Sequence, residues 1–207
     1  MRVLVACEYS GIVRDAFIEK GHDAMSCDLL PTELPGPHYQ GDVFDIINDG
    51  WDMMIAHPPC TYLSYVATRS WNDKGRITKR LESLEFFRKL WEAPIDKICV
   101  ENPKGCASPI IAKYSQIIQP WYFGEPHYKT TCLWLKNLPK LEHPEQNTFF
   151  VKTQKLNKPK PVYISPKTGK NVHWEEAMKG GKNRGHNRSK FWPSIAQAMA
   201  EQWGNNE

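Results

Sequence analysis

Short apolar runs alternate with segments of helical periodicity along the first 136 residues. The run at Arg2–Ala6 is continuously apolar after its first residue, which is typical of a strand that is buried on both faces. Segments between such runs repeat their apolar residues every three to four positions, as amphipathic helices do. This alternation predicts an α/β fold, in which a mostly parallel sheet has helices on both faces. The predicted strands are residues 2–6, 22–27, 42–47, 51–56, 96–101, 117–121 and 129–135, and the predicted helices are 11–20, 75–92 and 191–203.

The same pattern divides the chain into three parts. Residues 1–136 form the predicted core, in which a proline-rich loop covers 30–40. Residues 137–184 contain five prolines, many lysines and no clear periodicity, which predicts a short, basic and largely irregular insert. Residues 185–207 contain the last helix, which we expect to pack back on the core.

The charge of the chain is unevenly distributed. The net charge is +4, but residues 151–190 hold nine Lys and two Arg against two Glu, so this segment carries +9 and the rest carries −5. A basic segment on an acidic body favours a polyanionic partner such as nucleic acid, and we expect residues 151–183 to lie beside the active-site cleft. A Lys-rich segment that only keeps the protein soluble is the alternative interpretation.

Composition also bears on location and metals. No stretch of about 18 apolar residues is present, so the sequence predicts no membrane-spanning helix and no membrane partner. The chain starts with a predicted strand instead of the apolar run of a signal peptide, and we expect a cytoplasmic protein. Its six cysteines include no C-x-x-C pair, so we expect separate thiols and no metal site.

Polar and conformationally special residues follow nearly every predicted strand of the core. In an open α/β sheet, ligands bind at the carboxyl ends of the strands, so these residues are the candidate site. The sequences at these ends are Cys7-Glu8-Tyr9-Ser10-Gly11, Cys27-Asp28, Gly41-Asp42, Pro58-Pro59-Cys60 and Glu101-Asn102-Pro103.

The most specific of these ends is Pro58-Pro59-Cys60. Two consecutive prolines make the loop rigid, because each proline restricts its own φ and the residue before it. A thiol on such a loop is held in one position, which suits a nucleophile. The alternative is a small cysteine that merely packs at the end of a strand.

The carboxyl group of Glu101 comes at the end of the next strong strand. A carboxyl group near a thiol can deliver a proton to a ring nitrogen, provided that burial raises its pKa. Glu101-Asn102 on its own is also a common way to end a strand.

Together these segments resemble the DNA cytosine-5 methyltransferases. Pro59-Cys60 resembles the Pro-Cys motif of that family, and Glu101-Asn102 resembles its Glu-Asn motif. The resemblance covers roughly residues 1–136 and 184–203. Val13 and Arg14 stand where the family usually has two further glycines, and only about 48 residues occupy the place of its larger target-recognition domain. Weaker similarities are Tyr9-Ser10-Gly11 to the start of the cofactor loop, residues 123–129 to the Gly-x-Pro-Gln-x-Arg motif, and Gly185-His186-Asn187 to the last cofactor-side motif.

The resemblance implies a Rossmann-like fold that binds S-adenosylmethionine (SAM) and a role for each matching residue. Cys60 would attack carbon 6 of a cytosine, Glu101 would protonate or hydrogen-bond the ring nitrogen, and Lys129 would hold the pyrimidine carbonyl or lower the thiol pKa. Carbon 5 would then take the methyl group from SAM. The implied cofactor-binding residues are Tyr9, Ser10, Gly11, Asp28, Asp42, Pro58 and Asn187, with Tyr9 on the adenine, Asp28 on the ribose hydroxyls and Asp42 on the adenine amino group.

Several alternatives remain open at this point. The substrate implied is DNA, but RNA, a single strand or a free pyrimidine nucleotide would also fit so short a recognition region. Pro58-Pro59 also resembles the Asp/Asn-Pro-Pro-aromatic motif of enzymes that methylate amino nitrogens. A third interpretation is a nucleic-acid-binding module that keeps the fold and has lost the chemistry.

Overall fold

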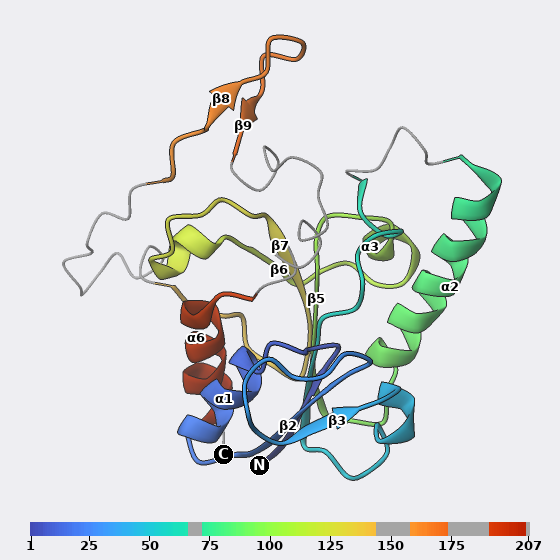
Figure 1. The fold of residues 1–207 in the computed structure, drawn as a ribbon, viewed down its shortest axis with the longest axis vertical. Helices are drawn as coiled ribbons and strands as arrows, with labels where there is room; N and C mark the ends of the chain where they lie inside the picture. The colour runs from blue at the N-terminus through green and yellow to red at the C-terminus, as the bar shows by residue number, and fades with distance from the viewer. Residues whose placement is uncertain (66–71, 144–157, 174–190, 206–207) are drawn as a thin grey trace.

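The computed structural model describes residues 1–65, 72–143, 158–173 and 191–205, and it confirms the α/β fold (Figure 1). Seven strands form one sheet in the order β3-β2-β1-β4-β5-β7-β6. The first five pair in parallel, whereas β7 runs antiparallel to both β5 and β6. The strands are β1 (Arg2–Ala6), β2 (Asp23–Asp28), β3 (His38–Gln40), β4 (Met53–Ala56), β5 (Lys97–Asn102), β6 (Gln116–Ile118) and β7 (Thr131–Lys136).

Helices cover both faces of the sheet because the central strands are apolar on both sides. In β1, Val3 and Val5 pack in the cluster that contains the buried residues of helices α1 (Ile12–Glu19) and α6 (Pro193–Gly204). Leu4 and Ala6 pack in the opposite cluster, which contains those of helix α2 (Lys74–Trp91). Figure 1 shows α1 and α6 side by side on one face and α2 on the other. Successive side chains of a strand point to opposite faces, so a continuous apolar run requires two helical layers.

The third strand lies earlier than the sequence pattern predicts. Residues 38–40 pair in parallel with Ser26–Asp28, inside the segment that was expected to be loop. The expected strand at 42–47 is wrong, because this segment forms a short 3-10 helix at Val43–Asp45 that begins when the Asp42 carboxylate accepts a hydrogen bond from the Phe44 backbone N–H. Its apolar residues face the core from a turn and not from a strand.

Helix α2 packs only along its C-terminal half. Leu84, Phe87 and Leu90 are buried against the sheet, as the periodicity predicts. Ile77 and Leu81 continue the same stripe but are 43% and 62% exposed. No helix among the described residues combines the length and the apolar character that crossing a membrane requires.

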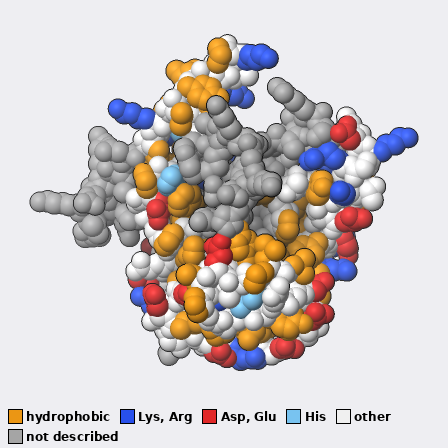
Figure 2. Space-filling view, viewed as in Figure 1, with side chains coloured by type: hydrophobic (Ala, Val, Ile, Leu, Met, Phe, Trp, Pro, Cys, Tyr) orange, Lys and Arg blue, Asp and Glu red, His pale blue; other side chains and the backbone are white. Residues whose placement is uncertain are grey.

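The described part of the basic insert contains a small antiparallel hairpin. Strands β8 (Tyr163–Ile164) and β9 (Asn171–Val172) pair there, which adds a short regular element to a segment that the sequence predicts to be largely irregular. Gly169 closes the turn with a left-handed φ of 64°. Val162, Tyr163 and Ile164 are each at least half exposed, and Figure 2 shows apolar and basic side chains together at this end of the molecule.

The last helix packs back on the core. Helix α6 lies against α1, and the ring of Trp203 is fully buried while its Nε1–H donates to the Pro139 carbonyl. The Gln202 side chain both accepts from the Glu142 N–H and donates to the Glu142 carbonyl. These bonds tie the end of the chain to the segment that follows β7.

Candidate active site and cofactor pocket

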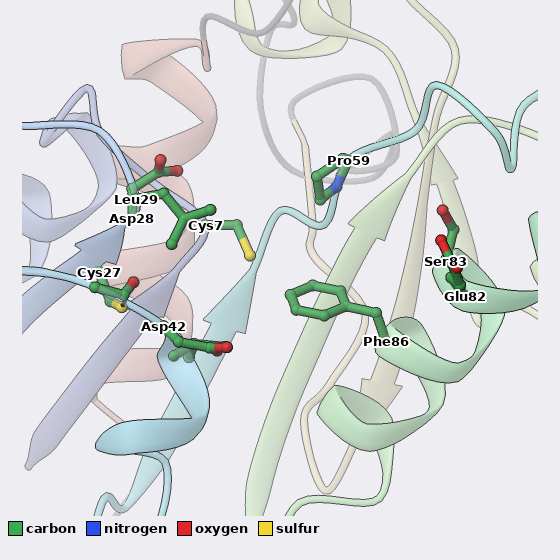
Figure 3. A pocket seen from close by; sticks show the side chains of 11 residues that line it. Cys7, Cys27, Asp28, Leu29, Asp42, Pro59, Glu82, Ser83 and Phe86 are labelled. Carbon is green, nitrogen blue, oxygen red and sulfur yellow. Dashed lines mark hydrogen bonds between the residues drawn. The ribbon is translucent and has the colours of Figure 1, made fainter. Parts of the chain in front are cut away.

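A pocket of about 370 Å³ opens at the carboxyl ends of β1, β2 and β4 and after β3, and we call it the strand-end pocket (Figure 3). This volume lies within the usual range for small-molecule sites. Asp28 and Asp42 contribute carboxylates, and Phe86 projects into the pocket from α2. The residues that line it are Cys7, Cys27, Asp28, Leu29, Gly41, Asp42, Val43, Pro59, Glu82, Ser83 and Phe86.

Each of the two aspartates has one oxygen tied to the backbone. Oδ1 of Asp28 accepts from the Leu30 N–H at 2.9 Å, and Oδ1 of Asp42 accepts from the Phe44 N–H at 3.0 Å. These bonds hold the carboxylates in place, while Oδ2 of each has no hydrogen-bond partner among the described residues. Two positioned acceptors beside the apolar walls of Leu29, Val43 and Phe86 can hold hydroxyl and amino donors of a ligand that also carries an aromatic ring.

Two thiols lie in the same pocket, those of the half-buried Cys7 and the buried Cys27. Cys7 adopts a left-handed backbone with φ of 59°, which is unusual for a residue with a side chain and turns the chain at the end of β1. Burial, with smaller contributions from nearby carboxylates, raises the pKa of the Cys7 thiol far above its ordinary value and that of Cys27 to about 12. Both therefore remain neutral, poorly nucleophilic thiols that supply packing surface.

Tyr9, Ser10 and Gly11 do not line the strand-end pocket. The expectation that Tyr9, Asp28 and Asp42 share one pocket therefore holds for the two aspartates alone. After Cys7 the chain turns inward: the buried Glu8 carboxylate accepts from the Ser10 hydroxyl and from the Val13 and Arg14 N–H groups, and so caps α1. Ser10 and Gly11 are buried at this helix start, and the Tyr9 side chain is half-buried.

Arg14 explains why the chain lacks the further glycines that the resemblance leads one to expect. Its side chain is fully buried, and its guanidinium donates to Asp15, Ser26, Thr32 and the carbonyls of Leu34 and Pro35. Each of these groups belongs to α1, β2 or the 30–37 loop. Arg14 thus links the proline-rich loop to the sheet. Its buried charge is tolerated because these hydrogen bonds satisfy the donors of the guanidinium.

The Cys60 loop follows β4 directly. Cys60 is exposed, and its carbonyl accepts from the N–H groups of Leu63 and Ser64, so a tight turn follows the thiol. Pro58 is buried and does not line the strand-end pocket, whereas Pro59 does. The residue immediately before the thiol therefore forms part of the pocket wall.

Two contacts with the end of β5 hold this loop. The buried Asn102 side chain donates from Nδ2 to the Pro58 carbonyl at 2.7 Å. Further along, Ser64 bridges Gly105, and the Cys106 N–H donates to the carbonyl of the fully buried Leu63. Because β4 and β5 are parallel neighbours, these contacts hold the Cys60 loop in a fixed position relative to the end of β5, where Glu101 lies.

Gly105→Ala should weaken the contact between the loop after Cys60 and the loop after β5. A Cβ at Gly105 would lie 2.1 Å from the Leu63 carbonyl oxygen, so the loop after Cys60 would have to move. We expect a loss of about 1–3 kcal/mol of unfolding free energy, measured by urea denaturation. Gly75→Ala is the matched control, since a Cβ there meets nothing within 4 Å and alanine suits a helix. Equal stability of the two variants would contradict the close approach.

Glu101 lies beside His57 at 3.4 Å between Oε2 and Nδ1, and both side chains are largely buried. Burial alone would raise the pKa of Glu101, but the hydrogen bond from His57 and the nearby charge of Lys129 outweigh it and hold the pKa below its ordinary value. The raised pKa that was set as the condition for a proton donor at this position is therefore not what the neighbours of Glu101 produce. The structure brings Glu101 and Lys129 close enough to interact, and it adds His57 to the site.

Aromatic rings surround these groups. His57 packs on Phe191 at 4.7 Å between ring centres, and His127 stacks on Trp192 at 4.3 Å. The ring of Tyr128, next to Lys129, stacks on His173 at 4.1 Å, which brings the basic hairpin to this end of the sheet. Asn187 lies outside the described residues. Within the described ranges, no cluster of His, Cys, Asp and Glu could hold a metal ion.

No family model matches the sequence, and no curated protein does. Solved structures match at the level of the fold. The S. pombe Dnmt2 methyltransferase shares 15% identity over 76% of this chain and 57% of its own, with a TM-score of 0.50. The Entamoeba histolytica methyltransferase EhMeth shares 15% identity over 69% of this chain and 54% of its own, with a TM-score of 0.45. A Spodoptera frugiperda DNMT2 mutant shares 16% identity over 87% of this chain and 60% of its own, with a TM-score of 0.38.

The S. pombe match identifies the fold. The seven-stranded sheet with an antiparallel β7 is that of a methyltransferase, which confirms the Rossmann-like methyltransferase fold expected from the sequence. The chain spans a little over half the length of the structures it matches.

Proposed function

We propose that this chain is a SAM-dependent methyltransferase that methylates carbon 5 of a cytosine, in DNA or a related nucleic acid or nucleotide, through a covalent bond to Cys60. One observation carries the proposal. Pro59 lies in the wall of the strand-end pocket, and the exposed Cys60 follows it on a loop that is tied to the strand of Glu101. A methyl donor in the pocket would thus lie beside the nucleophile.

The strand-end pocket fits the cofactor by its chemistry. Asp28 would accept from the ribose hydroxyls and Asp42 from the adenine amino group, through the oxygens that their backbone bonds leave available. Phe86 and Leu29 would contact the adenine, the role expected for Tyr9. SAM, when bound, supplies an electrophilic methyl group on a sulfonium sulfur.

The residues at the strand ends would carry out an addition and an elimination. The Cys60 thiolate forms a bond to carbon 6 while Glu101, in its protonated form, supplies a proton to the ring nitrogen, so carbon 5 becomes electron-rich toward the methyl group. Because His57 and Lys129 hold the pKa of Glu101 below its ordinary value, this step should be favoured at low pH. After methylation, a water molecule takes the proton from carbon 5, the electron pair re-forms the ring double bond, and the carbon 6–sulfur bond breaks to release the Cys60 thiolate, while the ring nitrogen returns its proton to Glu101. Lys129 would hold the pyrimidine carbonyl. The base must be out of a stack to reach the thiol.

The decisive experiment measures SAM binding and methyl transfer together. Calorimetry reports the affinity for SAM, and parallel assays with labelled SAM report transfer to DNA, RNA and dCMP. We expect SAM to bind and the product to carry its methyl group on carbon 5. A product methylated on nitrogen would favour an amino-methyltransferase, and SAM binding with no transfer to any of the three would favour a module without catalysis.

Asp28→Asn should weaken SAM binding by about 10- to 100-fold, because a hydrogen bond to a charged acceptor contributes about 1.5–3 kcal/mol. Asparagine retains the oxygen that accepts from the Leu30 N–H, so the loop should keep its conformation. Calorimetry with SAM measures the loss. Asp49→Asn is the control, since Asp49 is exposed and its carbonyl accepts from Arg2 at the start of β1, away from the pocket. An unchanged affinity in Asp28→Asn would contradict the pocket assignment.

A further inference from the structure

A second hollow lies on the other side of the thiol loop. It is an open groove of about 500 Å³ between the loop after Cys60, the loop after β5 and the segment that follows helix α3 (Ala107–Ile110). Tyr65 and Tyr114 contribute rings, and Lys104 and Lys113 contribute cations. We call it the tyrosine–lysine groove. None of the residues that line it is acidic.

Two walls of the groove follow the proposed reactive residues closely in the sequence: one comes after Glu101 and the other after Cys60. Lys104 comes three residues after Glu101, and its carbonyl accepts from the Tyr65 N–H at 3.2 Å. Tyr65 comes five residues after Cys60 and directly follows the turn closed by the Cys60 carbonyl. A molecule that extends from a base at Cys60 would therefore reach this groove.

Contacts with the sheet position Tyr114 and the loops of the groove. Trp134 of β7 is fully buried, donates from Nε1 to the Ala112 carbonyl and packs edge-on against Tyr114 at 5.9 Å between ring centres. On the opposite wall, the bridge between Ser64 and Gly105 joins the two loops. The rings and cations are thus carried by segments that the sheet holds in place.

The cations of the groove are exposed to solvent. Lys104 and Lys113 are exposed and take part in none of the ion pairs among the described residues. Tyr65 is 46% exposed and half-buried Tyr114 also borders the open space. Exposed rings beside exposed lysines are the combination that binds single-stranded nucleic acid, since bases stack on rings and phosphates pair with cations.

We propose that the tyrosine–lysine groove binds a nucleotide that flanks the target base, so that the substrate is a phosphodiester polymer and not a free pyrimidine nucleotide. The flanking base stacks on Tyr65, and the adjoining phosphates contact Lys104 and Lys113. This inference rests on the proposed function, because the position of the target base at Cys60 defines which nucleotide flanks it.

Binding of a fluorescent, cytosine-containing single-stranded oligonucleotide tests the groove without requiring turnover. Lys113→Ala and Lys104→Ala should each weaken affinity by about 5-fold at about 0.1 M salt, and each should reduce the slope of log K against log salt by about 0.7. Tyr65→Ala should lose at least about 5-fold, and Tyr65→Phe should retain the affinity. Parallel DNA and RNA oligonucleotides show which polymer is preferred.

Lys140→Ala is the matched control. Lys140 is also exposed, but its neighbour Leu141 packs in the cluster of α1 and α6, on the face of the sheet opposite the cluster against which Tyr114 packs. Its replacement should leave affinity and salt slope unchanged. Affinity for SAM should stay the same in every groove variant.

The outcomes separate the groove from the chemistry. Weaker oligonucleotide binding in the lysine variants, with no methyl transfer by the wild type to any substrate, would support the groove and refute the proposed function. Normal methyl transfer with unchanged oligonucleotide KM in the double variant Lys104→Ala/Lys113→Ala would refute the groove and leave the function intact. A wild type that does not bind the oligonucleotide overturns the inference outright.

Discussion

Cys60→Ser is expected to lose methyl transfer by about 10⁴-fold or more, as removal of a covalent nucleophile does in other enzymes. A serine hydroxyl is a much poorer nucleophile than a thiolate near neutral pH. The affinity for SAM should stay nearly the same, because Pro59 and not Cys60 lines the strand-end pocket. Cys60 is exposed, so the substitution should change stability by less than about 0.5 kcal/mol. Turnover, calorimetry with SAM and urea denaturation measure the three quantities.

A mechanism-based substrate makes this test sharper. A cytosine with fluorine at carbon 5 cannot lose a proton there, so the carbon 6–sulfur bond should persist. We expect an adduct that survives denaturation, that mass spectrometry locates on Cys60, and that is absent in Cys60→Ser. Cys106→Ser is the control, because Cys106 is buried and should not form an adduct. Methyl transfer by Cys60→Ser with the methyl group on nitrogen would refute covalent catalysis.

Glu101→Gln is expected to reduce kcat by about 10²- to 10⁴-fold, the usual contribution of a general acid. Glutamine has nearly the same shape and can donate a hydrogen bond, but it cannot transfer a proton to the ring nitrogen. Its effect should fall mainly on kcat, since the interaction is needed in the transition state. Steady-state kinetics with saturating SAM measure both constants. A variant with normal kcat and raised KM would show that Glu101 only binds the base.

The hydrogen bond from His57 to Glu101 should set the direction of the pH dependence of kcat/KM. A group that must be protonated makes kcat/KM fall as pH rises above its pKa in the free enzyme. His57 and Lys129 lower the pKa of Glu101, so the fall begins at low pH in the wild type. His57→Phe removes the hydrogen bond and the charge but retains a ring against Phe191, so it should raise the pKa of Glu101 and move this fall to higher pH. The pH profiles of the two proteins check the direction of the shift.

The sequence predicted those strands and helices whose formation depends on the pattern of apolar residues within the segment itself. The apolar run Arg2–Ala6 requires a strand buried on both faces, and the stripe of Leu84, Phe87 and Leu90 requires a helix packed on one side. Because parallel strands all end at one edge of a sheet, the polar residues after them could be predicted to converge. Asp28, Asp42 and the Cys60 loop do so.

Features that depend on distant partners could not be predicted in this way. Residues 38–40 have no strand-like pattern and form β3 because β2 offers an open edge for hydrogen bonds. Val13 and Arg14 indicated only that glycines were missing, whereas the fold buries the Arg14 guanidinium among acceptors from β2 and the 30–37 loop. The inward turn of Glu8, which leaves Tyr9 outside the strand-end pocket, likewise depends on the start of α1.

The sequence by itself determined the layered α/β fold, the edge of the sheet that carries the chemistry, and the residue types available there. Only the tertiary structure decided which of these side chains meet, the direction in which the pKa of Glu101 is shifted, and the second groove beside the thiol. The physical reason is one of range. Periodicity and strand ends are properties of a few consecutive residues, whereas a pKa or a pocket depends on neighbours from separate strands. The pKa of Glu101, for example, is lowered by His57 at the end of β4 and by Lys129 before β7.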